Sequence, residues 1–123
     1  MSVKGKWLLV GACILTAFMG CDPRAKHDIP PRPDNMLDRE TFVMLHAEMQ
    51  LLEAAHRQRM LHGGDRDAVR QAHRKQILAD AGVSDSAFTA TYEWWYSQPE
   101  ALPAVLEEVM ARLDSMERGS EWN

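Results

Sequence analysis

An amphipathic stripe in the last third of the chain restricts what this sequence can fold into. Its apolar residues recur at steps of three and four: Leu102, Val105, Leu106, Val109, Leu113 and Met116. This spacing predicts a helix with one apolar face that other elements must cover. Pro103 disturbs the opening turn, so we expect the helix to begin near Leu102 or to carry a kink. Gly119 is expected to end it.

A first helix is predicted from Leu37 to Leu61. Asp38 suits its N-cap position, and the glycine pair Gly63-Gly64 stops the chain from continuing as a helix. The apolar stripe of this segment consists of Phe42, Leu45, Met49, Leu52 and His56. The stripe predicts that the first helix also contributes a face to the core.

Two further helices are predicted between these segments. One runs from Arg66 to Ala81, with Asp65 as its cap and Gly82 as a stop in a Schellman motif. The next opens at Ser84 and ends at a proline-containing turn before the last helix. No segment has the alternating pattern of a strand. The predicted fold is therefore all-α, a small bundle of about four helices over residues 37–118.

The first 20 residues have the pattern of a lipoprotein signal peptide. Two lysines precede an uncharged apolar run from Trp7 to Met19, which is short for a bilayer span. Phe18-Met19-Gly20-Cys21 resembles a bacterial lipobox. That resemblance implies cleavage between Gly20 and Cys21, a diacylglycerol thioether on Cys21 and acylation of its new amino group. An uncleaved N-terminal anchor and ordinary secretion with cleavage nearby are the alternatives.

Residues 21–36 are interpreted as the lipidated cysteine and a proline-rich tether, and residues 119–123 as a tail. Removing residues 1–20 takes away two lysines, which leaves 12 Lys and Arg against 18 Asp and Glu, a formal charge of −6. This balance argues against nucleic acid as a partner, because phosphate binding is driven by Lys and Arg. With Cys21 lipidated, no thiol remains for a disulfide, a metal site or a nucleophile.

Four stretches resemble the Bacteroidota lipoprotein family called domain of unknown function 4296. They are Glu48 to Ala55, Ile77 to Phe88, Trp95-Tyr96-Ser97-Gln98-Pro99, and Val105 to Leu113. The resemblance implies a short helical domain behind a lipid cysteine and a proline-containing tether, and it implies no activity. Surface-exported lipoproteins of this phylum tend to carry an acidic cluster after the cysteine. Asp22-Pro23-Arg24-Ala25-Lys26 lacks one, so a periplasm-facing position is expected.

Residues that could carry chemistry are few. Glu53 and His56 have the Glu-x-x-His spacing of di-iron carboxylate bundles, but no second copy exists. The histidines His46, His56, His62 and His73 are expected to be scattered and partly exposed, since none forms an i,i+4 pair with another. No serine lies in a nucleophile-elbow sequence. We therefore expect no metal, no cofactor and no catalytic residue.

Charge is distributed unevenly along the chain. Between Arg57 and Lys75 lie six Lys or Arg and two Asp, whereas acids dominate from Gln98 onward. One interpretation is that the helix over 66–81 packs near the last helix with complementary surfaces. The other is a basic patch that touches anionic lipid headgroups or an acidic partner.

Trp94, Trp95 and Tyr96 are candidate partner-binding residues, because three consecutive large aromatic side chains cannot all face one core. Trp95 and Tyr96 are expected to pack or to form the turn. Phe88, Tyr92 and Trp95 lie within one narrow apolar arc of the predicted helix. Trp94 lies off this arc and is expected to be exposed, as tryptophans at binding hot spots are. In the alternative, the first turn of the last helix or the tether covers it.

These features together predict a helical module of the cell envelope, attached to the membrane through an N-terminal lipid. We expect it to bind or assemble with an envelope protein and not to be an enzyme. A small-ligand- or metal-binding envelope lipoprotein that uses histidine and methionine side chains is the alternative. An envelope hydrolase is a third hypothesis.

Overall fold

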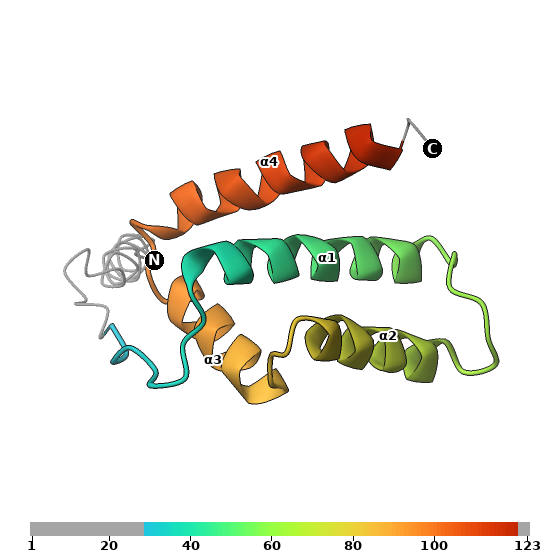
Figure 1. Ribbon diagram of the computed structural model, residues 1–123, viewed down its shortest axis with the longest axis horizontal. Coiled ribbons are helices and arrows are strands. Elements are labelled where there is room, and N and C mark those ends of the chain that lie inside the picture. Colours follow the sequence, from blue (N-terminus) through green and yellow to red (C-terminus); the bar gives the residue numbers. More distant parts are fainter. Residues whose placement is uncertain (1–28, 121–123) are drawn as a thin grey trace, which may run out of the picture.

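The computed structural model describes residues 29–120, which form four helices and no strand (Figure 1). These are α1 (Arg39–Arg57), α2 (Arg66–Asp80), α3 (Asp85–Tyr96) and α4 (Leu102–Ser120). The predicted all-α fold with a small bundle of helices is confirmed. Gly20, Cys21 and the rest of the predicted signal peptide lie outside the described residues. Over residues 29–120, the structure contains no helix with both the length and the apolar character that crossing a membrane requires.

Three helices begin at the predicted capping residues. The carboxylate of Asp38 accepts a hydrogen bond from the Thr41 amide at 2.9 Å, and that of Asp65 accepts from the first-turn amides of α2. The Ser84 hydroxyl oxygen accepts from the Ala87 amide at 3.1 Å. Each cap satisfies amides that have no partner within the helix, so the three N-termini are set by local sequence.

The two ends of α4 differ in how well the sequence predicts them. The helix begins at Leu102 as expected, and Pro103 is accommodated because first-turn amides have no intrahelical acceptor to lose. It then continues through Gly119 to Ser120, so the expectation that Gly119 ends it is wrong. α1 also departs from prediction, since it ends at Arg57 and not at Leu61.

Helix α1 is the centre of the fold. α4 runs alongside it in the same direction, α2 lies on its other side in the opposite direction, and α3 crosses near its N-terminal end (Figure 1). Phe42 and Leu45 of α1 and Val105 of α4 are completely buried where these helices meet. Leu78, Phe88, Trp95 and Val109 extend the same core.

This arrangement corrects the prediction that α2 packs near α4 with complementary charge. α1 lies between the two helices, and the basic residues of α2 find their acids elsewhere (Figure 1). Arg70 pairs with Glu53 of α1 at 2.8 Å, and Arg74 pairs with Asp85 of α3 at 2.7 Å. The order of positive and negative residues along the sequence could not reveal these ion-pair partners, because it does not show which helix lies in the middle.

The segment before α1 is tied to α3. The Leu37 amide donates to the Thr91 hydroxyl oxygen at 2.9 Å, and that hydroxyl donates to the Ala87 carbonyl at 2.7 Å. Thr91 is completely buried, so both hydrogen bonds form away from water. Residues 29–36, the described part of the predicted tether, therefore lead into a fixed contact with the domain.

Candidate functional site

The three consecutive aromatic residues at the end of α3 have three different environments. Trp94 is partly buried, so the expectation that it is exposed is wrong. Pro30, Pro31 and Pro33 lie over it, and the Arg32 guanidinium sits 6.0 Å from its ring centroid. The proline-rich segment thus covers Trp94, as the alternative interpretation proposed for the tether.

Trp95 belongs to the core. It is 9% exposed, and its ring stacks on Phe42 with centroids 6.5 Å apart. The Arg39 guanidinium lies 5.6 Å from the Trp95 ring on the outer side. Among the three candidates, Tyr96 is the most exposed, with 40% of the residue accessible.

Tyr96 is paired with a residue that the sequence analysis assigned to the apolar arc of α3. Tyr92 lies one turn earlier, is 36% exposed and stacks on Tyr96 with ring centroids 4.1 Å apart. Both rings meet His46 of α1 edge to face, at 5.5 and 6.0 Å. We call Tyr92, Tyr96 and His46 the tyrosine–histidine cluster.

His46 anchors this cluster from inside the protein. It is 2% exposed, stacks on Phe42 with centroids 5.4 Å apart, and shares a hydrogen bond of 3.1 Å between its Nε2 and the Tyr96 hydroxyl. The expectation that the histidines are all partly exposed is therefore wrong for His46. Its position could have been found, because it lies four residues after Phe42 and three before Met49, on the apolar stripe itself.

Both partners of this hydrogen bond favour their uncharged forms. Burial lowers the pKa of His46, because the imidazolium would lose its hydration. Burial of the hydroxyl end raises the pKa of Tyr96 to about 12, with a smaller contribution from Tyr92. The stability that neutral His46 contributes is present above its unfolded pKa of about 6.5 and is lost as the pH falls below it.

A hollow of about 430 Å³ adjoins the tyrosine–histidine cluster between α1 and α3. His46, Met49 and Leu52 line its α1 side, and Phe88 and Tyr92 line its α3 side. Arg74 borders it, held by two hydrogen bonds to Asp85 and lying 5.3 Å from the Phe88 ring centroid. The result is an apolar depression with exposed tyrosine at its rim.

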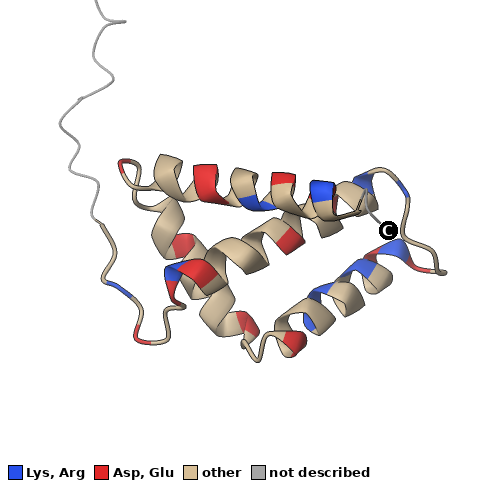
Figure 2. Ribbon diagram, turned by 45° about the horizontal axis from the view of Figure 1, so that its top comes forward, with Lys and Arg blue, Asp and Glu red and all other residues tan. Residues whose placement is uncertain are grey.

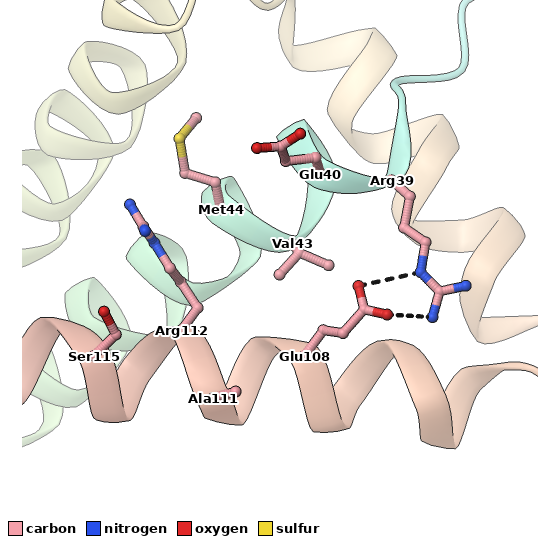
Figure 3. Close-up of a pocket in the computed structure, with 8 residues that line it drawn as sticks. All are labelled: Arg39, Glu40, Val43, Met44, Glu108, Ala111, Arg112 and Ser115. Atoms are coloured by element: carbon pink, nitrogen blue, oxygen red, sulfur yellow. Dashed lines mark hydrogen bonds and ion pairs between the residues drawn. The ribbon is translucent and has the colours of Figure 1, made fainter.

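A second hollow, of about 600 Å³, lies between α1 and α4 (Figure 3). Arg39 and Glu108 form a two-point ion pair at one end, with N–O distances of 2.6 and 3.2 Å. Arg112 extends from α4 towards Met44 of α1 (Figure 3). Ser115 is the one hydroxyl among its lining residues and no histidine lines it, so they offer no nucleophile with an adjacent base.

The Glu-x-x-His pair faces α2, where each of its two side chains has a polar neighbour. Glu53 accepts from Arg70, while His56 Nε2 lies 3.5 Å from the Asp67 carboxylate. His62 and His73 are exposed elsewhere. Across residues 29–120, the structure brings no three His, Cys, Asp or Glu side chains into a metal-binding arrangement.

Comparison with known proteins gives one match. The family model described as Domain of unknown function (DUF4296) matches residues 33–118. No curated protein and no solved structure matches the chain. The matched range begins within the proline-rich segment and ends in the last turns of α4, so it includes the contacts among the four helices but not those of Pro30, Pro31 and Arg32 with Trp94. Because the match spans more than half of the sequence, the chain belongs to the DUF4296 family.

Proposed function

We propose that this protein is a lipid-anchored module of the cell envelope of a Bacteroidota bacterium, and that it acts by binding another envelope protein, not by catalysis. The anchor rests on the uncharged apolar run from Trp7 to Met19 followed by Gly20-Cys21. The absence of an acidic cluster directly after Cys21 favours a periplasm-facing position.

The observation that supports a binding role is the stacked tyrosine pair on α3. Tyr92 and Tyr96 are both exposed, yet each ring is braced against buried His46 and against the other. Tyrosine is enriched in protein interfaces because it offers a large apolar face and a polar tip with few rotatable bonds. Since these two rings are already held in place, a partner loses little side-chain entropy by ordering them.

The binding surface differs from the one that the sequence suggested. Trp94 lies beside the proline-rich segment and Trp95 lies in the core, so neither provides the main exposed contact. Tyr92 and Tyr96 provide the exposed contact, and the apolar hollow beside them can receive a side chain of the partner. Glu53 and Glu93 also line this hollow, so a partner with a basic residue beside an apolar anchor suits it best.

Crosslinking in cells tests the binding role. A photoreactive phenylalanine analogue at Tyr92 should capture one abundant envelope protein, identified by mass spectrometry. The same analogue at exposed Glu107 of α4 is the matched control and should not capture it. Capture at both positions, or at neither, would contradict the assigned surface.

Affinity for the captured protein gives the second test. Tyr92→Ala should weaken binding by roughly 30-fold, the equivalent of a ~2 kcal/mol hot spot, whereas Tyr92→Phe keeps the ring and should bind nearly as the wild type does. Equal affinities for the alanine and phenylalanine variants would show that the ring does not contact the partner.

The lipid anchor is tested separately. Cys21→Ala should abolish processing of residues 1–20 and incorporation of labelled fatty acid. A Cys21→Ala protein that is processed normally and stays membrane-bound would contradict lipidation at Cys21.

A further inference from the structure

The C-terminal end of α1 has an unusual residue in a common motif. The Met60 amide donates to the Ala55 carbonyl at 2.9 Å and the Arg59 amide to the His56 carbonyl at 3.1 Å. These are the two hydrogen bonds of a Schellman motif, in which glycine normally takes the left-handed position. Arg59 occupies it here with φ 58°, a conformation that side chains with a Cβ rarely adopt.

The next residue departs from the motif as well. A Schellman motif usually packs its last residue against the helix, but Met60 is 61% exposed. Leu61 instead turns inward and contacts the core. Met60 is therefore exposed close in sequence to the arginines at positions 57 and 59, both of which are also exposed.

The surrounding cations are not neutralised by neighbours. Over residues 29–120, no Asp or Glu carboxylate lies within 4.0 Å of the charged groups of Arg57, Arg59, Arg66 or Lys75. Arg66 donates to the His56 carbonyl at 2.6 Å, which fixes its side chain against the same helix end. Arg57, Arg59, Arg66 and Met60 form the surface that we call the basic tip.

Charge is segregated across the molecule. Basic residues gather on α2 and on the end of α1 beside it, while acidic residues outnumber basic ones on α4, on the other side of α1 (Figure 2). Residues 98–120 contain five acids and two arginines. The described segment that leads into α1 joins it at the end away from the α1–α2 connection (Figure 1).

We propose that the basic tip docks on anionic phospholipid headgroups, with Met60 inserted at the level of the interface. The three arginines match the lipid phosphates, and each cation near an anionic bilayer contributes to binding. An exposed apolar side chain near several arginines is suited to a bilayer interface, because its tip enters the acyl boundary while the charges remain in the headgroup layer. An acidic protein would satisfy the charges but would leave Met60 without a defined pocket. This proposal goes beyond the partner-binding role and does not depend on lipidation.

Vesicle titration with the full chain tests it. Vesicles of phosphatidylcholine alone are compared with vesicles that also contain phosphatidylglycerol. The double substitution Arg57→Gln and Arg59→Gln should weaken binding to the anionic vesicles by about fivefold for each arginine, and it should leave binding to phosphatidylcholine unchanged. The N-terminal residues are the same in every variant, so their contribution to vesicle binding cancels when variants are compared.

A matched control removes the same charge from the acidic side. Arg112→Gln with Arg118→Gln also lowers the net charge by two, but both residues lie on α4. If this pair weakens vesicle binding as much as the first pair, binding follows net charge and the proposal is overturned. Met60→Ser should weaken binding only to anionic vesicles, where the cations bring residue 60 to the surface.

If the N-terminal residues dominate attachment to the vesicles, a measurement at the basic tip itself is needed. Amide hydrogen exchange across residues 57–62 should slow on anionic vesicles and not on phosphatidylcholine, and Arg57→Gln with Arg59→Gln should abolish the difference. Equal exchange on both vesicle types would overturn the proposal. If the double variant instead loses binding to an acidic protein while vesicle binding is intact, the partner is that protein and not the bilayer.

Discussion

Helices α1 and α2 end in the same pair of backbone hydrogen bonds, but with opposite residue choices. At the end of α2, Gly82 takes the left-handed position with φ 66°, and Val83 packs back against the core. At the end of α1, Arg59 takes the same position and Met60 is exposed. The α2 end has the stabilising choices, glycine at the left-handed position and a packed apolar residue after it. The α1 end lacks both, and the two residues concerned are those that we assign to lipid contact.

The free-energy cost of placing Arg59 in the left-handed position can be estimated. A non-glycine residue in the left-handed region costs roughly 1–2 kcal/mol, and glycine recovers part of that difference through its larger entropy in the unfolded chain. Departures from local rules are expected where a site serves function. The comparison can be tested at each equivalent position.

The largest difference is expected at the third residue from each helix end. Leu78 is 4% exposed, so Leu78→Ala should lower the free energy of unfolding by roughly 2–5 kcal/mol through the cavity it leaves. Ala55 occupies the same position in α1, and Ala55→Gly should cost about 1 kcal/mol, the helix propensity difference. Urea unfolding measures both, and equal losses would contradict the view that only the α2 end is anchored in the core.

A smaller loss is expected at the α2 glycine. Gly82→Ala should destabilise by about 1 kcal/mol. A Cβ at this position meets no atom within 4 Å, so the effect comes from backbone conformation alone. Gly64→Ala is the matched control, since a Cβ there also meets open space and the backbone has no positive φ. A loss as large at Gly64 would point to a general effect of removing glycine.

The same substitution in reverse should stabilise α1. Arg59→Gly is expected to raise the free energy of unfolding by about 0.5 kcal/mol. Glycine relieves the strain of the left-handed backbone, but its larger entropy in the unfolded chain offsets part of that stabilisation. It should also weaken binding to anionic vesicles about fivefold. Arg59→Lys keeps both the charge and the strain, so it should change neither quantity. A destabilised Arg59→Gly protein would mean that the arginine side chain contributes to the fold.

The smallest effect is expected at the residue after each left-handed position. Met60→Ser should change the free energy of unfolding by less than about 0.5 kcal/mol, because an exposed side chain loses few contacts. Val83→Ser should destabilise clearly more, since Val83 is partly buried against the core. Thermal unfolding of the two variants compares them, and a large loss for Met60→Ser would indicate that Met60 packs against the protein in solution.

Local features of the fold were predictable because they depend on neighbouring residues. The caps at Asp38, Asp65 and Ser84 and the Schellman end at Gly82 form within a few residues, so the sequence shows them directly. The end of α1 was missed because Arg59 carries no propensity signal for the left-handed region, while Gly63-Gly64 does.

The candidate site was predictable only in part. Tyr96 was identified as a contact residue, but its partner Tyr92 was assigned to the core arc and Trp94 to the surface. Those assignments used only the angular position of each residue around the axis of α3. They could not take into account the contact between Trp94 and the proline-rich segment. The burial of His46 could have been predicted from its spacing to Phe42 and Met49. It was missed because histidine was treated as a surface residue.

The amino-acid sequence establishes helix number, helix starts, the net negative charge of the chain and the candidate lipid cysteine, because each is a property of a short segment or of composition. The tertiary structure decides that α1 lies between α2 and α4, which sets the ion-pair partners and separates the basic side from the acidic side. It also decides that His46 lies beneath two tyrosines. These contacts join residues about 50 positions apart, and their geometry follows from how whole helix faces pack, not from any local preference.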